Sequence, residues 1–204
     1  MENNILEEYN DIKTPSELLE FMDKHIKYGI HGTDDKDYTS WDNDINSEFQ
    51  KACQNRYSLC DKDRILKYGL GTCWDDVELE RCWFKEHNYS FKTFFIWFRF
   101  DYDNNYGTHT YLVYEENNKY YYFEYADENN RGIKEFDSYE DAIKYHMNLH
   151  ISFMKKCGLV INGEVLDHLE VIEYDNPTYG CNMEEFIDYM LNSKIIYKNG
   201  KFIK

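Results

Sequence analysis

Three strand patterns in succession, in the middle of the chain, constrain the fold most. The first, at residues 91–100, is so dense in aromatic side chains that it predicts a strand buried on both faces. The second and third, at 108–114 and 120–125, are rich in tyrosine and β-branched residues, and a polar turn at 116–118 separates them. We therefore expect an antiparallel meander, which commits the chain to building a β-sheet.

Helical patterns flank this meander on both sides, so the predicted fold class is α+β. Residues 14–17, Thr-Pro-Ser-Glu, have the form of a capping box with proline at the first helical position, and we expect Gly29 and Gly32 to end that helix. The polar stretch 31–44 is predicted to be a solvated loop, since its aspartates lack the spacing of a calcium site. Further helices are expected at 45–57, 61–68, 73–86, 139–156 and 183–191, a strand at 165–174, and a hairpin at 195–203 around Asn199-Gly200.

The composition excludes several classes of function. With 39 acidic and 23 basic residues, the formal charge of -16 repels phosphate backbones and anionic membrane surfaces. The chain does not open on a secretory signal, and no apolar stretch is long enough to cross a bilayer. No Pro/Gly/Ser-rich linker interrupts residues 1–204. We expect one cytoplasmic domain that binds neither nucleic acid nor membrane.

The cysteines and histidines predict no metal and no cofactor. No two cysteines form a Cys-x-x-Cys pair, so free thiols are expected in a reducing cytosol. His146 and His150 lie four residues apart on a predicted helix; a metal pair is one interpretation, and histidines at the surface or boundary of the fold are the favoured one. The six cysteines are Cys53, Cys60, Cys73, Cys82, Cys157 and Cys181.

One of these cysteines stands at the predicted start of a helix. Residues 71–76, Gly-Thr-Cys-Trp-Asp-Asp, precede a run of helix formers, with Thr72 as the N-cap and Cys73 as the first helical residue. A free thiol has a pKa of about 8.5, and helix N-termini with a cationic neighbour lower that value to roughly 3.5–7.5. Cys73 is therefore a candidate nucleophile, although a buried packing cysteine fits the same hexapeptide.

A thiol nucleophile needs a base and a group that orients the base, and the meander supplies both. Folding the hairpin about residue 117 places His109 opposite about residue 125, so Glu124 or a neighbour can reach the imidazole. A shift of one residue in the register decides which side chain points the right way. Asp127, just past the strand, is the competing carboxylate.

These residues together resemble the transglutaminase-like superfamily within the papain-like cysteine-enzyme fold. The likeness covers about residues 65–135 and rests on three motifs, in which His109 follows Cys73 by 36 positions and Glu124 follows His109 by 15. It implies Cys73 as nucleophile, His109 as base and then acid, and an acidic residue that orients His109. The family usually has Asp followed by Pro where this chain has Glu124-Tyr125. The motifs are Gly71-Thr72-Cys73-Trp74-Asp75, Thr108-His109-Thr110 and Tyr122-Phe123-Glu124.

The predicted function is cysteine-dependent acyl transfer, with hydrolysis of an amide or peptide bond favoured over transamidation. The substrate would be a protein or peptide, and the amide of Cys73 would donate to the oxyanion, with Trp41 or Gln50 as candidates for a second donor. Two other classes stay open. One is a catalytically inactive binding module on the same fold, and the other is an arylamine acetyltransferase, which also uses a Cys-His-acid triad.

Overall fold

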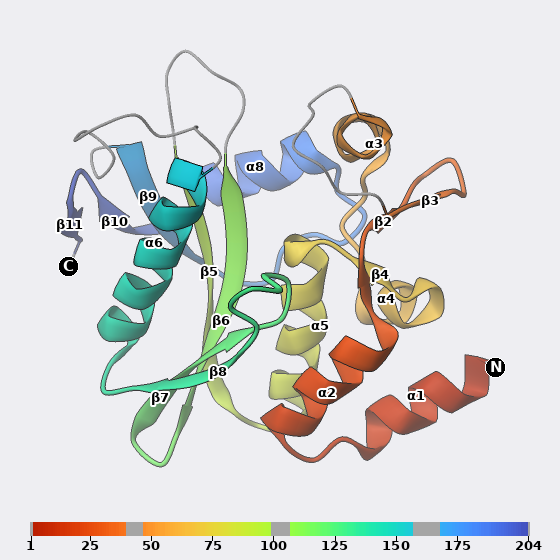
Figure 1. Cartoon of the computed structure of the whole chain (residues 1–204), viewed down its shortest axis with the longest axis horizontal. Helices are drawn as coiled ribbons and strands as arrows, with labels where there is room; N and C mark the ends of the chain where they lie inside the picture. The colour runs from red at the N-terminus through yellow and green to blue at the C-terminus, as the bar shows by residue number, and fades with distance from the viewer. Residues whose placement is uncertain (1, 40–46, 99–106, 157–167, 204) are drawn as a thin grey trace.

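The structure is a computed structural model that describes residues 2–39, 47–98, 107–156 and 168–203 (Figure 1). Its centre is a seven-stranded sheet with the order β11-β10-β9-β5-β6-β7-β8, in which every pair of neighbours is antiparallel. The α+β class predicted from the sequence is confirmed, and so is the meander of β5, β6 and β7. The strands of this sheet are β5 Ser90–Phe98, β6 Thr108–Glu116, β7 Lys119–Glu124, β8 Gly132–Phe136, β9 Leu169–Tyr174, β10 Lys194–Lys198 and β11 Lys201–Phe202.

The helices follow the predicted positions closely, apart from the first. Helix α2 begins at the predicted capping box, where the Glu17 amide donates to the Thr14 hydroxyl at 3.2 Å, but it ends at His25, before the two glycines expected to end it. Helix α1 was not predicted from the sequence. The helices are α1 Glu2–Asp11, α2 Pro15–His25, α3 Glu48–Arg56, α4 Lys62–Tyr68, α5 Cys73–Glu86, α6 Tyr139–Lys156 and α8 Met183–Leu191.

Short strands replace part of the predicted loop at 31–44. Strand β2 (Ile30–His31) pairs with β3 (Asp37–Tyr38), and β1 (Lys27–Tyr28) runs parallel to β4 (Leu70–Gly71). Two-residue strands carry no hydrophobic period, so the sequence pattern did not show them. The predicted strand at 165–174 is described from Leu169 onward, and the start of the predicted helix at 45–57 lies outside the described residues.

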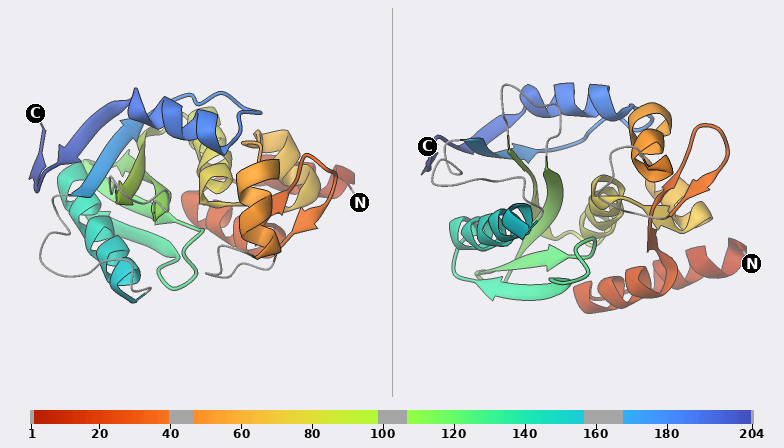
Figure 2. Two further views of the ribbon diagram at one scale, coloured as in Figure 1. Left: turned by 90° about the horizontal axis from the view of Figure 1, so that it is seen from above. Right: turned by 45° about the horizontal axis from the view of Figure 1, so that its top comes forward.

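Two helices cover opposite faces of the central sheet. Helix α5 packs through Trp83 and Phe84 on a face that includes Leu112, whereas α6 packs on Phe94 and Val113 of the other face. Figure 2 shows α5 and α6 on the two sides of β5 and β6. Strand β5 is buried from Thr93 to Phe98, as its aromatic content predicts, because both layers press on it. The N-terminus of α5 and the first residues of β6 therefore lie where the helical layer meets the sheet.

Candidate active site

The first turn of α5 is anchored by a buried carboxylate. The amide and hydroxyl of Thr72, the predicted N-cap, donate to Asp75 Oδ2 at 2.9 and 2.8 Å. The other oxygen of Asp75 accepts from the Tyr57 hydroxyl and the Cys60 amide, both at 2.9 Å. These four hydrogen bonds tie the start of the helix to the preceding segment, so Cys73 has a fixed place as the first residue of α5.

Just before the cysteine, the backbone of β4 lies close to the backbone that follows β1. The Gly29 amide donates to the Gly71 carbonyl at 2.9 Å and continues the pairing of β1 with β4. A Cβ atom on Gly71 would lie 2.2 Å from Asp76 Oδ1, so a side chain at this position would force the buried Asp76 to move. The glycine of the motif thus allows the first turn of α5 to pack against the loop that leads into it.

The β6–β7 hairpin sets the positions of the histidine and the glutamate. Its ladder pairs Leu112 with Phe123, and the turn residues are Asn117 and Asn118. The predicted register, centred on residue 117 alone, is therefore wrong by one residue. The physical reason is that a two-residue turn has its centre between its two residues.

This one-residue correction decides which face the glutamate occupies. The predicted register would have set Glu124 opposite Thr110, on the other face from His109. Continued by one pair, the observed ladder sets Glu124 opposite Tyr111, and alternate residues of β6 share a face, so His109 and Glu124 become diagonal neighbours. His109 Nε2 lies 2.8 Å from Glu124 Oε2.

The thiol of Cys73 approaches the same imidazole. The Cys73 side chain lies close enough to His109 to help raise the pKa of the imidazole, and since Nε2 is engaged by Glu124, Nδ1 is the ring nitrogen available to the sulfur. The Thr110 hydroxyl donates to the Cys73 carbonyl, which fastens the tip of α5 to the strand residue next to His109. The structure thus brings together the three predicted site residues Cys73, His109 and Glu124.

Charge is arranged to favour an imidazolium–carboxylate pair. Burial opposes both charges, yet the carboxylate of Glu124 and the contact with Cys73 hold the pKa of His109 well above its ordinary value. Glu124 is 2% exposed. Burial works to raise its pKa, but His109 and two further donors outweigh this effect, so the pKa of Glu124 lies below its usual value. Those donors are the Tyr122 hydroxyl at 2.7 Å and the Asp127 amide at 2.8 Å.

Asp127, the competing carboxylate, has a different part. Its own side chain accepts from the Asn129 amide at 3.1 Å and from Asn130 Nδ2 at 2.7 Å. Through its backbone it donates to Glu124, so it closes the loop beyond β7 and supports the glutamate from outside the strand. Glu124 is the residue whose carboxylate contacts His109.

The cysteine is largely covered, as the packing alternative expects. Cys73 is 7% exposed and belongs to a core cluster that includes Trp74 and Val77. Trp74 stacks on Phe186 of α8 with ring centroids 4.3 Å apart and is therefore a packing residue. The Tyr28 hydroxyl on β1 also lies close to the Cys73 side chain, and nothing in the sequence indicated this neighbour.

Of the two predicted candidates for a second oxyanion donor, Gln50 lies in the described part of the chain. Trp41 lies outside the described residues. Gln50 lies in the first turn of α3, where its amide donates to the Ser47 hydroxyl at 3.1 Å. Helix α3 does come close to the site, because Ala52 belongs to the same core cluster as Cys73 and Cys53 packs against that cluster.

The two histidines of α6 are buried, so the expectation that they lie at the surface or boundary is wrong. His150 Nε2 lies 3.0 Å from the Gly107 carbonyl, and burial lowers the pKa of His150 to about 3. His146 bonds through Nδ1 to the Tyr122 hydroxyl at 2.8 Å, and burial lowers its pKa well below the ordinary value. Helical spacing turned both rings toward the sheet, and the large aromatic core around them covers both.

One set of side chains has the composition of a metal site. Ligand atoms of His109, Glu124 and His146 lie within 4.8 Å of one another, and two histidines with one carboxylate are donors that zinc accepts. The glutamate oxygen is already bonded to His109 and to Tyr122, and His146 Nδ1 is bonded to that same tyrosine. The geometry of the set is that of a hydrogen-bonded chain.

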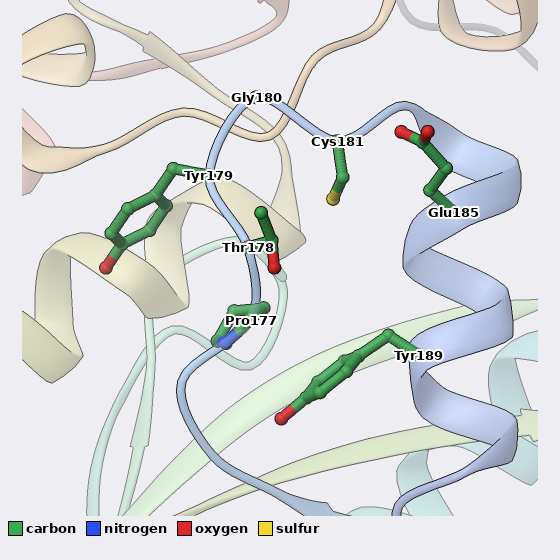
Figure 3. Close-up of a pocket in the computed structure, with 7 residues that line it drawn as sticks. All are labelled: Pro177, Thr178, Tyr179, Gly180, Cys181, Glu185 and Tyr189. Carbon is green, nitrogen blue, oxygen red and sulfur yellow. The ribbon is translucent and has the colours of Figure 1, made fainter.

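A surface hollow of about 420 Å³ lies elsewhere, between the segment 177–181 and α8 (Figure 3). Figure 3 shows the Cys181 side chain between that segment and Glu185 of the helix. Burial raises the pKa of Cys181 to about 11, which leaves it a thiol near neutral pH. Neither Cys73 nor His109 lines this hollow, so it is not the place where the predicted nucleophile would meet a substrate.

Other described cysteines have no activating partner. Burial raises the pKa of Cys53 to about 12, and it also raises the pKa values of Cys60 and Cys82. Within the described part of the chain, Cys73 is the thiol that contacts a histidine. Cys157 lies outside that part.

Comparison with known proteins adds no assignment. No model of a known protein family matches the chain, and no curated protein is significantly similar to it. Among the described helices, none is both long enough and apolar enough to cross a membrane. The description of the site therefore rests on the residues of this chain alone. They are a cysteine at the start of a helix, a histidine beside it and a buried glutamate that holds the histidine.

Proposed function

We propose that this chain is a cysteine-dependent acyl-transfer enzyme with a papain-like, transglutaminase-like core that hydrolyses an amide or peptide bond. The observation that carries the proposal is the order of contacts around one ring. His109 bonds to Glu124 through Nε2 at 2.8 Å and contacts the Cys73 thiol with its other side. This is the arrangement of nucleophile, base and orienting group that acyl transfer requires.

The proposed reaction has two halves. In the first, the Cys73 thiolate attacks the carbonyl carbon of the amide, the carbon–nitrogen bond breaks, and the His109 imidazolium gives its proton to the departing amine. In the second, His109 takes a proton from water, the oxygen attacks the thioester, and the carbon–sulfur bond breaks to release the acid and the thiolate. Glu124 keeps its charge throughout and stabilises the imidazolium.

The negative oxygen of each tetrahedral intermediate needs donors. The amide of Cys73 is the first, because it belongs to the unpaired first turn of α5. The Tyr28 hydroxyl reaches the Cys73 side chain and is a described candidate for the second, beside the predicted Trp41 and Gln50. Asp76 is also buried, and burial together with nearby Asp75 raises its pKa strongly, which opposes a second negative charge there.

One observation favours a second candidate function. Because Cys73 is 7% exposed and shares its cluster with large aromatic side chains, the fold would also suit a binding module that has no turnover. In such a module the same hydrogen bonds would serve only to stabilise the fold. Chemical reactivity of the thiol separates the two.

The test is alkylation of Cys73 with iodoacetamide, followed by peptide mass spectrometry, across pH 5–9. We expect Cys73 to react faster than the other described cysteines at pH 6, and His109→Ala to slow that reaction about tenfold or more. Cys53 and Cys181 are internal controls, since their raised pKa values keep them unreactive. Cys73→Ala removes the labelled peptide, and identical pH profiles for wild type and His109→Ala would reject the proposal.

A further inference from the structure

The hydrogen bonds do not stop at Glu124. Its Oε2 also accepts from the Tyr122 hydroxyl at 2.7 Å, and that hydroxyl lies 2.8 Å from His146 Nδ1 on α6. Tyr122 is 1% exposed and His146 2% exposed. A continuous chain of hydrogen bonds thus runs from His109, beside Cys73, through Glu124 and Tyr122 to helix α6.

The hydrogens of this chain can be arranged in one way. Glu124 is ionised and only accepts, so the single proton of the Tyr122 hydroxyl points to it. The tyrosine oxygen must then accept from His146, so Nδ1 of that ring carries a hydrogen. Burial lowers the pKa of His146, which agrees with a neutral ring. Its Nε2 is buried, and no described group bonds to it.

Aromatic packing fixes the orientation of that ring. His146 stacks on Tyr111 with centroids 4.0 Å apart and lies nearly parallel to His109 at 5.0 Å and 15°. Tyr111 follows His109 by two residues on β6, so the two side chains lie on the same face of the sheet. The histidine of α6 is therefore clamped by the strand that carries the catalytic base, and it cannot turn without disturbing both.

We propose that Tyr122 and His146 are positioning residues that hold Glu124 in its charged, inward orientation and so extend the site from three residues to five. The proposal rests on the proposed function, in which Glu124 orients His109. Tyr122 acts on the carboxylate directly, and His146 acts through Tyr122 by directing its only proton toward Glu124. Neither touches the reacting sulfur.

The same atoms offer a competing interpretation as a zinc site. A zinc ion bound by His109, Glu124 and His146 would have to take the oxygen that Tyr122 bonds and would remove the base from the thiol. Elemental analysis of the purified chain decides this. Stoichiometric zinc, with alkylation of Cys73 accelerated by a chelator, would overturn the positioning proposal.

The main test compares Tyr122→Phe with wild type in the iodoacetamide assay. Loss of a hydrogen bond to a buried charge should move the acid limb of the pH profile of Cys73 alkylation up by about one unit, so the rate at a given pH on that limb should fall about tenfold. The reason is that Glu124, with one donor fewer, holds its proton to higher pH. A purely structural role would lower the unfolding midpoint and leave the limb in place, and that outcome would overturn the proposal.

Variants of His146 separate its hydrogen bond from its packing. His146→Phe keeps a ring against Tyr111 but has no donor, and we expect it to shift the profile in the same direction as Tyr122→Phe. His146→Asn presents an amide hydrogen near the position of Nδ1 and should restore part of the rate. Because His146 acts through Tyr122, the double variant should be no slower than Tyr122→Phe alone, and additive losses would contradict the relay.

A measurement independent of reactivity keeps this inference distinct from the proposed function. Nitrogen-15 NMR of the wild-type chain reads the histidine tautomers directly. If Nδ1 of His146 carries the hydrogen in the wild type, and Tyr122→Phe abolishes the hydrogen bond of that group, the relay is supported even if Cys73 proves unreactive. Hydrogen on Nε2 of His146 would overturn the relay even if Cys73 is activated.

Discussion

Helix α5 carries buried carboxyl groups that differ in how well they are satisfied. Asp75 accepts four hydrogen bonds, whereas both oxygens of Asp76 and Oε2 of Glu80 are buried without a partner among the described residues. Burial, with repulsion from neighbouring carboxylates, raises the pKa values of Asp76 and Glu80 strongly. Groups of this kind stay protonated in the folded chain and cost stability when they ionise.

For Glu78, the pH range over which ionisation of a buried carboxyl group lowers stability can be stated. Burial raises its pKa from 4.5 to about 7, despite the opposing bond from Arg81. The folded chain thus holds this proton more tightly than the unfolded chain, so stability is complete below pH 4.5 and falls as the pH rises toward 7. Glu78→Gln should remove that fall, by up to about 3 kcal/mol. Urea unfolding of both proteins at pH 4.5 and 7.5 measures the difference, and parallel curves would contradict it.

Two asparagines make the turn that fixes the register of the site. Asn117 and Asn118 have φ values of 52° and 60°, the left-handed conformation that two-residue hairpin turns require. Asn118→Ala should lower the free energy of unfolding by about 1 kcal/mol, since alanine tolerates this conformation poorly. Asn118→Gly is the matched control and should cost little. Equal losses in the two variants, measured by urea unfolding, would show that the turn conformation is not the cause.

Elements with a clear period could be predicted, and elements without one could not. The aromatic strand β5, the hairpin β6–β7 and the capped helix α2 follow from spacing, capping and turn residues. The edge strand β8 is only partly buried, and its pattern of intermediate and exposed residues gives no alternation to detect. Helix α1 lacks a capping signal in the sequence, and the two-residue strands depend on tertiary pairing.

At the scale of the whole molecule, the sequence indicated the reacting groups but not their supports. Cys73, His109 and Glu124 could be proposed because helix capping and hairpin folding are local. Tyr122 and His146 meet only when α6 packs across the sheet, and no spacing in the chain ties that helix to β7. The near-burial of Cys73 likewise results from layers that meet from distant parts of the chain.

A buried hydroxyl connects the start of α5 to the central sheet. Thr110 of β6 donates to the Cys73 carbonyl and so fixes the tip of α5 relative to the strand that carries His109. Thr110→Val keeps the shape of the side chain and removes that bond. We expect the free energy of unfolding to fall by about 1–2 kcal/mol. Because small displacements of reacting groups are costly, we also expect alkylation of Cys73 at pH 6 to slow on the order of tenfold.

The sheet supplies a matched control for this change. Thr93 of β5 is equally buried, and its hydroxyl also donates to a backbone carbonyl, that of Tyr174, at 2.6 Å. The Thr93 hydroxyl also accepts a hydrogen bond from Arg81 of α5, so Thr93→Val should cost at least as much stability, yet it leaves the bond between Thr110 and Cys73 intact and should leave the alkylation rate of folded protein unchanged. If both variants slow alkylation alike, the reactivity follows general stability, and the Thr110 bond has no special part in holding the thiol beside the imidazole.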